Sequence, residues 1–150
     1  MAIKSEVREN LLILTMNNPK AEEQRHGEIR EIFEDAKKHN VKAAIVDFTN
    51  LQEVDSICLG MLISGQIVLG PGCRIHLCGM TAHAANSIRT AGLNKVFRIH
   101  GDLKTALERY ERRKQSRRNL ERRGKDAMAL INRRENNTRR LKKDRRRKSN

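Results

Sequence analysis

The sequence predicts an α/β fold in which a mixed, mostly parallel sheet of four to five strands packs against about four helices. Three observations lead to this prediction. Segments typical of strands and of helices alternate through residues 1–110. The helical segments carry apolar residues on a face that a sheet could cover. Residues 111–150 are instead rich in Arg and Lys and poor in apolar side chains, so we expect a basic, partly helical or disordered extension.

The net charge of +14 is divided unevenly along the chain. Residues 1–104 hold 13 Lys and Arg against 12 Asp and Glu, whereas residues 105–150 hold 19 against 6. A chain of 150 residues is long enough for one domain with a stable apolar core. We therefore expect one nearly neutral domain over residues 1–110 and a basic extension over residues 111–150.

Four short apolar runs with polar or turn residues at their ends are predicted strands. They are LLILTM at 11–16, AAIVDF at 43–48, RIHLC at 74–78 and VFRI at 96–99. Between the first two runs, apolar residues at i, i+3, i+4 and i+7 predict a helix over 22–39 with one buried face. These residues are Ile29, Ile32, Phe33 and Ala36. Thr81 is the expected N-cap of a helix that ends at Gly92, and Asp102 caps the last helix. Gly70-Pro71-Gly72 is read as a turn.

The segment 57–69 is apolar nearly all the way round a helix, which predicts a buried helix. Asp55 and Ser56 fall at its N-terminus, where unpaired backbone N–H groups donate hydrogen bonds to side-chain oxygens. One interpretation is a simple helix cap. The other is a phosphoacceptor, because the helix dipole and the N–H groups favour a phosphate at this position.

Several motifs in this order resemble the STAS domain, the family of sulphate transporters and anti-sigma factor antagonists. They are VDFTNL at 46–51, VDS at 54–56, LGMLI at 59–63 and the run from RIHLCG to LKTALE at 74–108. The resemblance extends over residues 5–110. It implies a STAS-like fold and, in the antagonist branch, phosphorylation of Ser56 by an anti-sigma serine kinase and its reversal by a phosphatase. The unphosphorylated domain would bind the kinase and displace the sigma factor.

The resemblance also implies a partner-binding surface around Asp55, Ser56, Ile57 and Cys58. Ile57 and Cys58 stand where the family commonly has a hydroxyl residue and then Gly. The acidic turn that follows the family's first long strand is not reproduced at residues 16–20, and Glu22 and Glu23 are the nearest replacements. We therefore expect an anti-sigma factor antagonist that is not an enzyme. The alternative is a STAS-fold scaffold or nucleic-acid-associated protein without a phospho-switch.

The extension contains repeated pairs and one triplet of arginines, which are the predicted polyanion-binding residues. They are Arg112, Arg113, Arg117, Arg118, Arg122, Arg123, Arg133, Arg134, Arg139, Arg140, Arg145, Arg146 and Arg147. Such a segment is either a solvated extension or a binding site for nucleic acid or an anionic membrane surface. No aromatic residue follows Tyr110, so contacts would go to phosphates and not to stacked bases.

The remaining polar residues predict no catalytic, cofactor or metal site. Cys58, Cys73 and Cys78 lack metal-ligand spacing, which favours reduced cysteines that pack in the core. His76, His83 and His100 are too scattered for a metal site. The longest apolar run near the N-terminus is too short for a signal peptide or a membrane span, so we expect a cytoplasmic protein.

Overall fold

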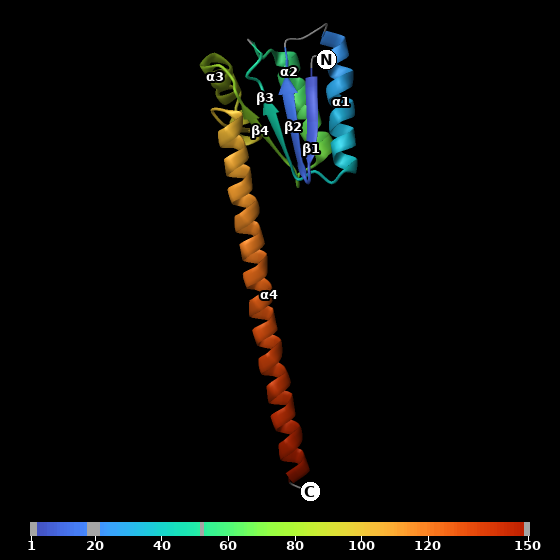
Figure 1. Cartoon of the computed structure of the whole chain (residues 1–150), viewed down its shortest axis with the longest axis vertical. Helices are drawn as coiled ribbons and strands as arrows, with labels where there is room; N and C mark the ends of the chain where they lie inside the picture. Colours follow the sequence, from blue (N-terminus) through green and yellow to red (C-terminus); the bar gives the residue numbers. More distant parts are fainter. Residues whose placement is uncertain (1–2, 18–21, 52, 149–150) are drawn as a thin grey trace. The chain divides into compact units, whose positions relative to one another are not determined.

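The computed structural model describes residues 3–17, 22–51 and 53–148. Its five strands and four helices follow one another in the order drawn in Figure 1. Their bounds are β1 (Ile3–Arg8), β2 (Leu11–Met16), α1 (Glu22–Lys38), β3 (Ala43–Asp47), α2 (Ser56–Leu69), β4 (Arg74–Cys78), α3 (Ala82–Thr90), β5 (Arg98–Ile99) and α4 (Leu103–Lys148). A short 3-10 turn, Leu93–Lys95, precedes β5.

The strands form one sheet in the order β1-β2-β3-β4-β5. β1 pairs antiparallel with β2, and all the other neighbours are parallel. The predicted α/β class and the mostly parallel sheet are therefore confirmed. The register places Leu14 of β2 beside Val46 of β3, and Val46 beside Leu77 of β4, so their side chains share one face of the sheet.

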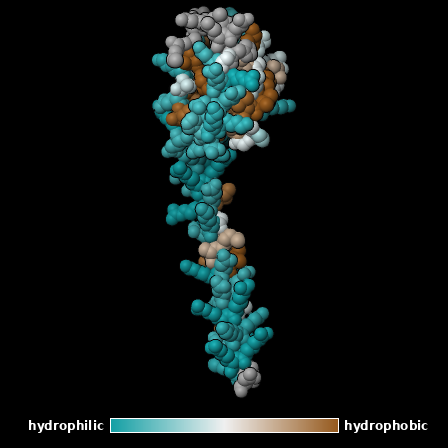
Figure 2. All heavy atoms as spheres, turned by 90° about the vertical axis from the view of Figure 1, so that its right-hand side faces the viewer, coloured by the Kyte–Doolittle hydropathy of each residue, from teal (hydrophilic) through white to brown (hydrophobic). Residues whose placement is uncertain are grey.

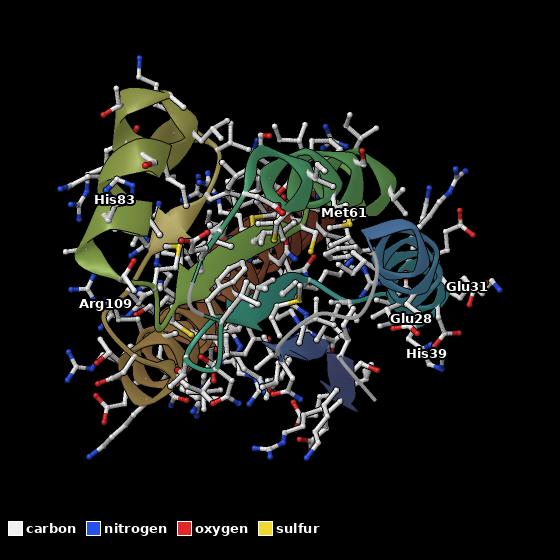
Figure 3. All side chains as sticks on the ribbon, turned by 90° about the horizontal axis from the view of Figure 1, so that it is seen from above. Glu28, Glu31, His39, Met61, His83 and Arg109 are labelled. Carbon is white, nitrogen blue, oxygen red and sulfur yellow. The ribbon has the colours of Figure 1, made fainter. Side chains whose placement is uncertain are left out.

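The apolar core lies between this face and the helices α1 and α2. Figure 3 shows both helices on the same side of the sheet. Phe33 of α1 is fully buried and lies so close to Gly65 of α2 that a Cβ added at residue 65 would clash with the Phe33 ring. The two helices can pack this closely because residue 65 has no side chain.

Side-chain caps begin the later helices as the sequence predicts. Thr81 Oγ1 accepts a hydrogen bond from the backbone N–H of Ala84 at 3.2 Å, and Asp102 Oδ1 accepts one from Thr105 at 2.7 Å. The Asp102 carboxylate has a lowered pKa, chiefly because of this backbone hydrogen bond. Gly92 lies just past α3 with φ of 73°, the left-handed conformation that favours glycine at a helix end.

Three elements differ from the prediction. β1 precedes the first predicted strand, and its edge position with only Ile3 buried explains why its sequence gives little strand signal. β5 has two residues where four were predicted, because Val96 and Phe97 belong to the preceding turn and bend. α2 is not buried all round, since it meets the rest of the domain on one side only; its buried residues are Cys58, Met61, Leu62 and Gly65.

Contacts divide the chain into two compact units, Met1–Glu108 and Arg109–Asn150. In the first unit, α4 contributes the buried Ala106. In the second unit, α4 continues as one helix as far as Lys148, with its side chains almost entirely exposed. Within the described residues, none of the helices has the length and apolar character needed to cross a bilayer.

Candidate phosphoacceptor and partner-binding site

The candidate site lies at the carboxyl ends of the parallel strands, where the loops after β2, β3 and β4 meet. In open α/β sheets, this edge is the usual location of binding sites. The Asn50 side-chain amide, after β3, donates to Oδ1 of Asn17, after β2, at 2.8 Å. The backbone N–H of Phe48 donates to the carbonyl of Cys78, at the end of β4, at 2.9 Å. These bonds hold the loop that carries Ser56 to both neighbouring strand ends.

Asp47 organises the first turn of this loop. Its Oδ1 accepts hydrogen bonds from the backbone N–H of Thr49 at 3.0 Å and from the Thr49 hydroxyl at 2.5 Å. Gly79, after β4, has φ of 72°, and a Cβ added there would clash with the Thr49 side chain. The two loops therefore pack against each other too closely for a side chain at residue 79.

Asp55 is the N-cap of α2, and Ser56 is the first residue of the helix. Asp55 Oδ1 accepts a hydrogen bond from the backbone N–H of Cys58 at 2.7 Å, which confirms the predicted cap. Both Asp55 and Ser56 are exposed to solvent. An exposed hydroxyl thus lies at the positive end of a helix dipole, where the helix favours an added negative charge.

The exposed side of α2 continues from Ser56 along the helix. Gly60, Ile63, Ser64 and Ile67 follow at helical spacing and are all exposed, with Ile63 37% and Ile67 75% accessible. The whole helix, SICLGMLISGQIVL, contains no charged residue. The serine therefore begins a solvent-exposed strip that is uncharged and partly apolar, as partner-binding surfaces often are.

A groove borders this strip. It has a volume of about 500 Å³ and lies between α1 and α2, where Phe33, Met61 and Ile67 contribute to its lining. Figure 3 shows Met61 on the side of α2 that is turned toward α1. The groove extends the apolar surface of the strip toward α1.

The other predicted partner-binding residues differ in accessibility. Ile57 is half-buried. Cys58 was predicted to belong to the partner-binding surface, but it is 1% exposed and its side chain lies in the core. Its backbone N–H donates to the Asp55 cap. Glu22 and Glu23 begin α1, but their side chains lie outside the described residues.

The cysteines and histidines of the described residues form no cluster of three or more groups placed to hold a metal ion. Cys73 and Cys78 are buried thiols, and desolvation raises their pKa values to about 11 and about 12. His76 and His100 are buried and stacked, with Nδ1 of His76 2.9 Å from Nε2 of His100. His83 is exposed on α3 (Figure 3). The sequence does not predict the pairing of His76 with His100, because no local pattern links residues 24 positions apart.

All the predicted polyanion-binding arginines lie on α4 and are exposed. Figure 2 shows this part of the helix as mostly hydrophilic, with a hydrophobic band near its middle and a smaller hydrophobic patch closer to the first unit. The exposed large apolar residues of this part are Met128, Leu130 and Ile131, which are close in sequence, and the isolated Leu120 and Leu141. The extension was predicted to be partly helical or disordered, and the structure shows the arginines on one continuous helix.

No protein-family model matches the chain, and no curated protein matches it in sequence. Many solved structures have a similar fold at low sequence identity, and they include the following three. A putative anti-sigma factor antagonist from Thermotoga maritima is 15% identical with a TM-score of 0.62, over 71% of this chain and 92% of that chain. The anti-sigma factor antagonist SpoIIAA in its unphosphorylated form is 18% identical with a TM-score of 0.60, over 73% of this chain and 96% of that chain.

SpoIIAA of Bacillus in its phosphorylated form is 18% identical with a TM-score of 0.54, over 73% of this chain and 99% of that chain. Each comparison covers almost all of the solved protein. The chain therefore has the STAS fold, which it shares with solved anti-sigma factor antagonists.

Proposed function

We propose that this chain is an anti-sigma factor antagonist, a protein-protein interaction module that binds an anti-sigma serine kinase and is switched by phosphorylation of Ser56. The observation that carries the proposal is the exposed Ser56 at the first residue of α2. The fold supports it, because solved antagonists have this fold and one of them, SpoIIAA, has been solved in both unphosphorylated and phosphorylated forms.

The electrostatics of the site explain how phosphorylation would act as a switch. A phosphate on Ser56 adds about two negative charges at pH 7. They would lie at the end of a helix without charged residues and beside the Asp55 carboxylate, which already occupies the Cys58 N–H. A partner fitted to the neutral strip would then have to desolvate these charges, so it dissociates. A phosphatase restores the binding surface.

The exposed apolar residues of α2 give this module a surface for its partner. Ile63 and Ile67 lie on the same side of the helix as Ser56. Burying such side chains contributes roughly 1.5–3 kcal/mol each when they are fully exposed beforehand. We infer that the kinase contacts Ser56 at one end of the strip and apolar side chains further along it.

Phosphorylation of the purified chain tests the proposal. The chain is incubated with ATP and an anti-sigma serine kinase from the same organism, and the phosphopeptides are located by mass spectrometry. Phosphate is expected on Ser56 and should disappear in Ser56→Ala. Ser64→Ala is the matched control, because Ser64 is exposed on the same helix; it should remain fully phosphorylated.

Binding to the same kinase supplies the second measurement. Ser56→Glu should weaken binding at least tenfold, whereas Ser87→Glu, the same change at an exposed serine of α3, should not. If phosphate goes elsewhere, or if Ser56→Glu binds as tightly as the unmodified chain, the phospho-switch is wrong. The remaining candidate would then be a STAS-fold scaffold that acts through residues 109–148.

A further inference from the structure

The second unit has an internal charge pattern that its total charge conceals. Residues 109–125, the first basic segment, hold nine Lys and Arg against two Glu. Residues 132–148, the second basic segment, hold ten Lys and Arg against two acidic residues. Between them lies the spacer DAMALI, residues 126–131, with one acidic residue and no basic one. Two 17-residue segments of similar positive charge are therefore separated by a short, mainly apolar spacer.

The distance between these segments is fixed by the helix. Both belong to α4, which runs without interruption to Lys148. Their central residues, Arg117 and Arg140, are 23 positions apart, which corresponds to about 35 Å at a rise of about 1.5 Å per residue. One turn of B-form DNA is about 34–36 Å long. Two points of contact this far apart meet the same feature of a duplex on successive turns.

The side chains of the segments suit phosphates. Fourteen of the 19 basic residues in the second unit are arginines, and a guanidinium can donate two parallel hydrogen bonds to one phosphate. Tyr110 is the last aromatic residue of the chain, so the helix lacks the stacking platforms typical of single-strand binding. These features favour a double-stranded ligand that is recognised through its backbone.

Other partners fit the helix less well. An interfacial membrane helix separates a broad apolar face from a charged one, whereas the consecutive apolar residues 127–131 point in all directions around the axis and the basic residues do likewise. A second copy of the same unit would bring two net charges of +14 together (19 basic minus 5 acidic residues each). Like charges at this density oppose helix pairing.

We propose that residues 109–148 bind duplex DNA lengthwise, with the two basic segments on the phosphate backbone one helical turn apart. Binding is independent of base sequence and strongly dependent on salt, since it releases counterions. It also relieves the repulsion between neighbouring basic side chains, so the helix becomes more stable when it is bound. This function is separate from the switch at Ser56.

Duplex length provides the first test. At about 1.5 Å per residue, residues 109–148 extend over about 60 Å, which corresponds to about 18 base pairs at about 3.4 Å each. Affinity measured by fluorescence anisotropy should therefore rise steeply between duplexes of about 10 and about 18 base pairs and then level off. The affinities are first corrected for the larger number of overlapping binding positions on longer duplexes. A continuous rise through and beyond this range contradicts binding in a fixed register.

A change of spacing separates the proposal from general charge attraction. Deletion of residues 126–132 removes about two helical turns, which keeps the faces of the helix aligned and brings the segments about 10 Å closer. The deletion removes one acidic residue and no basic one, so the net charge rises. General attraction then predicts equal or tighter binding, whereas the proposal predicts binding to a 24-base-pair duplex that is at least tenfold weaker. The matched control replaces the same seven residues with alanines and should bind normally.

Two charge-matched variants test the equivalence of the segments. One changes four arginines of the first segment to Gln (Arg117, Arg118, Arg122 and Arg123), and the other changes four of the second (Arg133, Arg134, Arg139 and Arg140). Each should weaken binding by a similar factor and reduce the salt dependence by about four counterions. Loss of binding from one segment only would overturn the two-segment arrangement.

Anionic vesicles containing phosphatidylserine test the alternative ligand. Leu130→Ser with Ile131→Ser should leave DNA binding unchanged, because these side chains lie in the spacer. The proposal is refuted if the full chain binds these vesicles but not DNA and the double variant no longer binds the vesicles. The helix would then be assigned to a membrane surface. Ser56→Ala should bind DNA like the unmodified chain. A failure of the DNA-binding proposal can therefore be distinguished from a failure of the phospho-switch at Ser56.

Discussion

The side chain of Asp55 and the backbone N–H of Cys58 form the hydrogen bond that begins α2, with an Oδ1 to N distance of 2.7 Å. Ser56 lies between these two partners in the sequence and is exposed. The same aspartate thus stabilises the helix and fixes the backbone on which the serine is presented. Stability and recognition at this site can therefore be separated only by suitable pairs of variants.

Replacement of Asp55 by Ala should destabilise the domain by about 1 kcal/mol, because the N-cap acceptor is lost. It should also slow phosphorylation of Ser56 by the kinase. Asp55→Asn is the control, since its amide oxygen can still cap the helix and should preserve stability. Urea denaturation and a kinase assay measure the two effects. If Asp55→Ala has the stability and the phosphorylation rate of the original chain, Asp55 contributes neither to helix capping nor to kinase recognition.

Ile67→Glu should weaken kinase binding at least tenfold and leave the unfolding free energy within about 0.5 kcal/mol of the original. The reason is that Ile67 is 75% exposed and contributes little to the core. Asn86→Glu on α3 is a control for the added charge, because Asn86 is exposed on another helix. Calorimetric titration and thermal melting give the two quantities. Normal kinase binding by Ile67→Glu would exclude this end of α2 from the interface.

Gly65→Ala should destabilise the domain by about 1–3 kcal/mol, the usual cost of overpacking a core. The added methyl group would clash with the Phe33 ring, so one of the two helices has to shift. Gly60→Ala provides the contrast on the same helix, because nothing lies within 4 Å of its added Cβ. Its expected effect is a stabilisation of up to about 1 kcal/mol from helix propensity. Equal effects of the two substitutions in urea denaturation would show that α1 and α2 are not in close contact here.

A chain that ends at Lys114 should remain folded, with an unfolding free energy within about 0.5 kcal/mol of the full chain. It keeps the buried Ala106, whereas the exposed Leu120, Met128 and Ile131 are removed. A chain that ends at Asp102 is the control and should be clearly destabilised. Unfolding of the chain that ends at Lys114, measured by circular dichroism, would mean that residues beyond 114 contribute to a core.

The unfolding free energy should decrease as the pH rises from about 9 toward 11. Cys73 and Cys78 have native pKa values raised to about 11 and about 12 by burial, compared with 9.0 for a thiol in water. In this range the unfolded chain binds fewer protons than the native one, so alkaline pH favours unfolding. Denaturation at a series of pH values should give a shallower decrease for Cys73→Ala with Cys78→Ala than for the original chain. Identical slopes would contradict a contribution of the thiols.

The sequence was sufficient for most of the fold because its signals were local. Thr81 and Asp102 cap helices where their positions predicted, and the helical spacing of Ile29, Phe33 and Ala36 identified the buried face of α1. β1 gave no comparable signal. As an edge strand with only Ile3 buried, it has no regular alternation of apolar and polar residues.

The surface of α2 could not be predicted in the same way. An apolar side chain such as Ile67 has the same sequence signal whether it is buried in its own domain or exposed for a partner. Burial depends on how many elements surround the helix, which is a property of the tertiary structure. For the extension, net charge argued for disorder while Arg, Lys, Glu and Leu favour helix, and the structure shows the second tendency.

The two edges of the sheet limit how the domain can associate. An edge strand with free N–H and C=O groups can recruit a strand from another molecule and so begin aggregation. β5 has only two residues, and β1 carries Lys4, Glu6 and Arg8 on one face, with an ion pair of 2.6 Å between the last two. Short length and alternating charge both disfavour strand addition. A partner of this domain would therefore be selected by side chains on helices and loops, where one substitution or one phosphate can change its affinity.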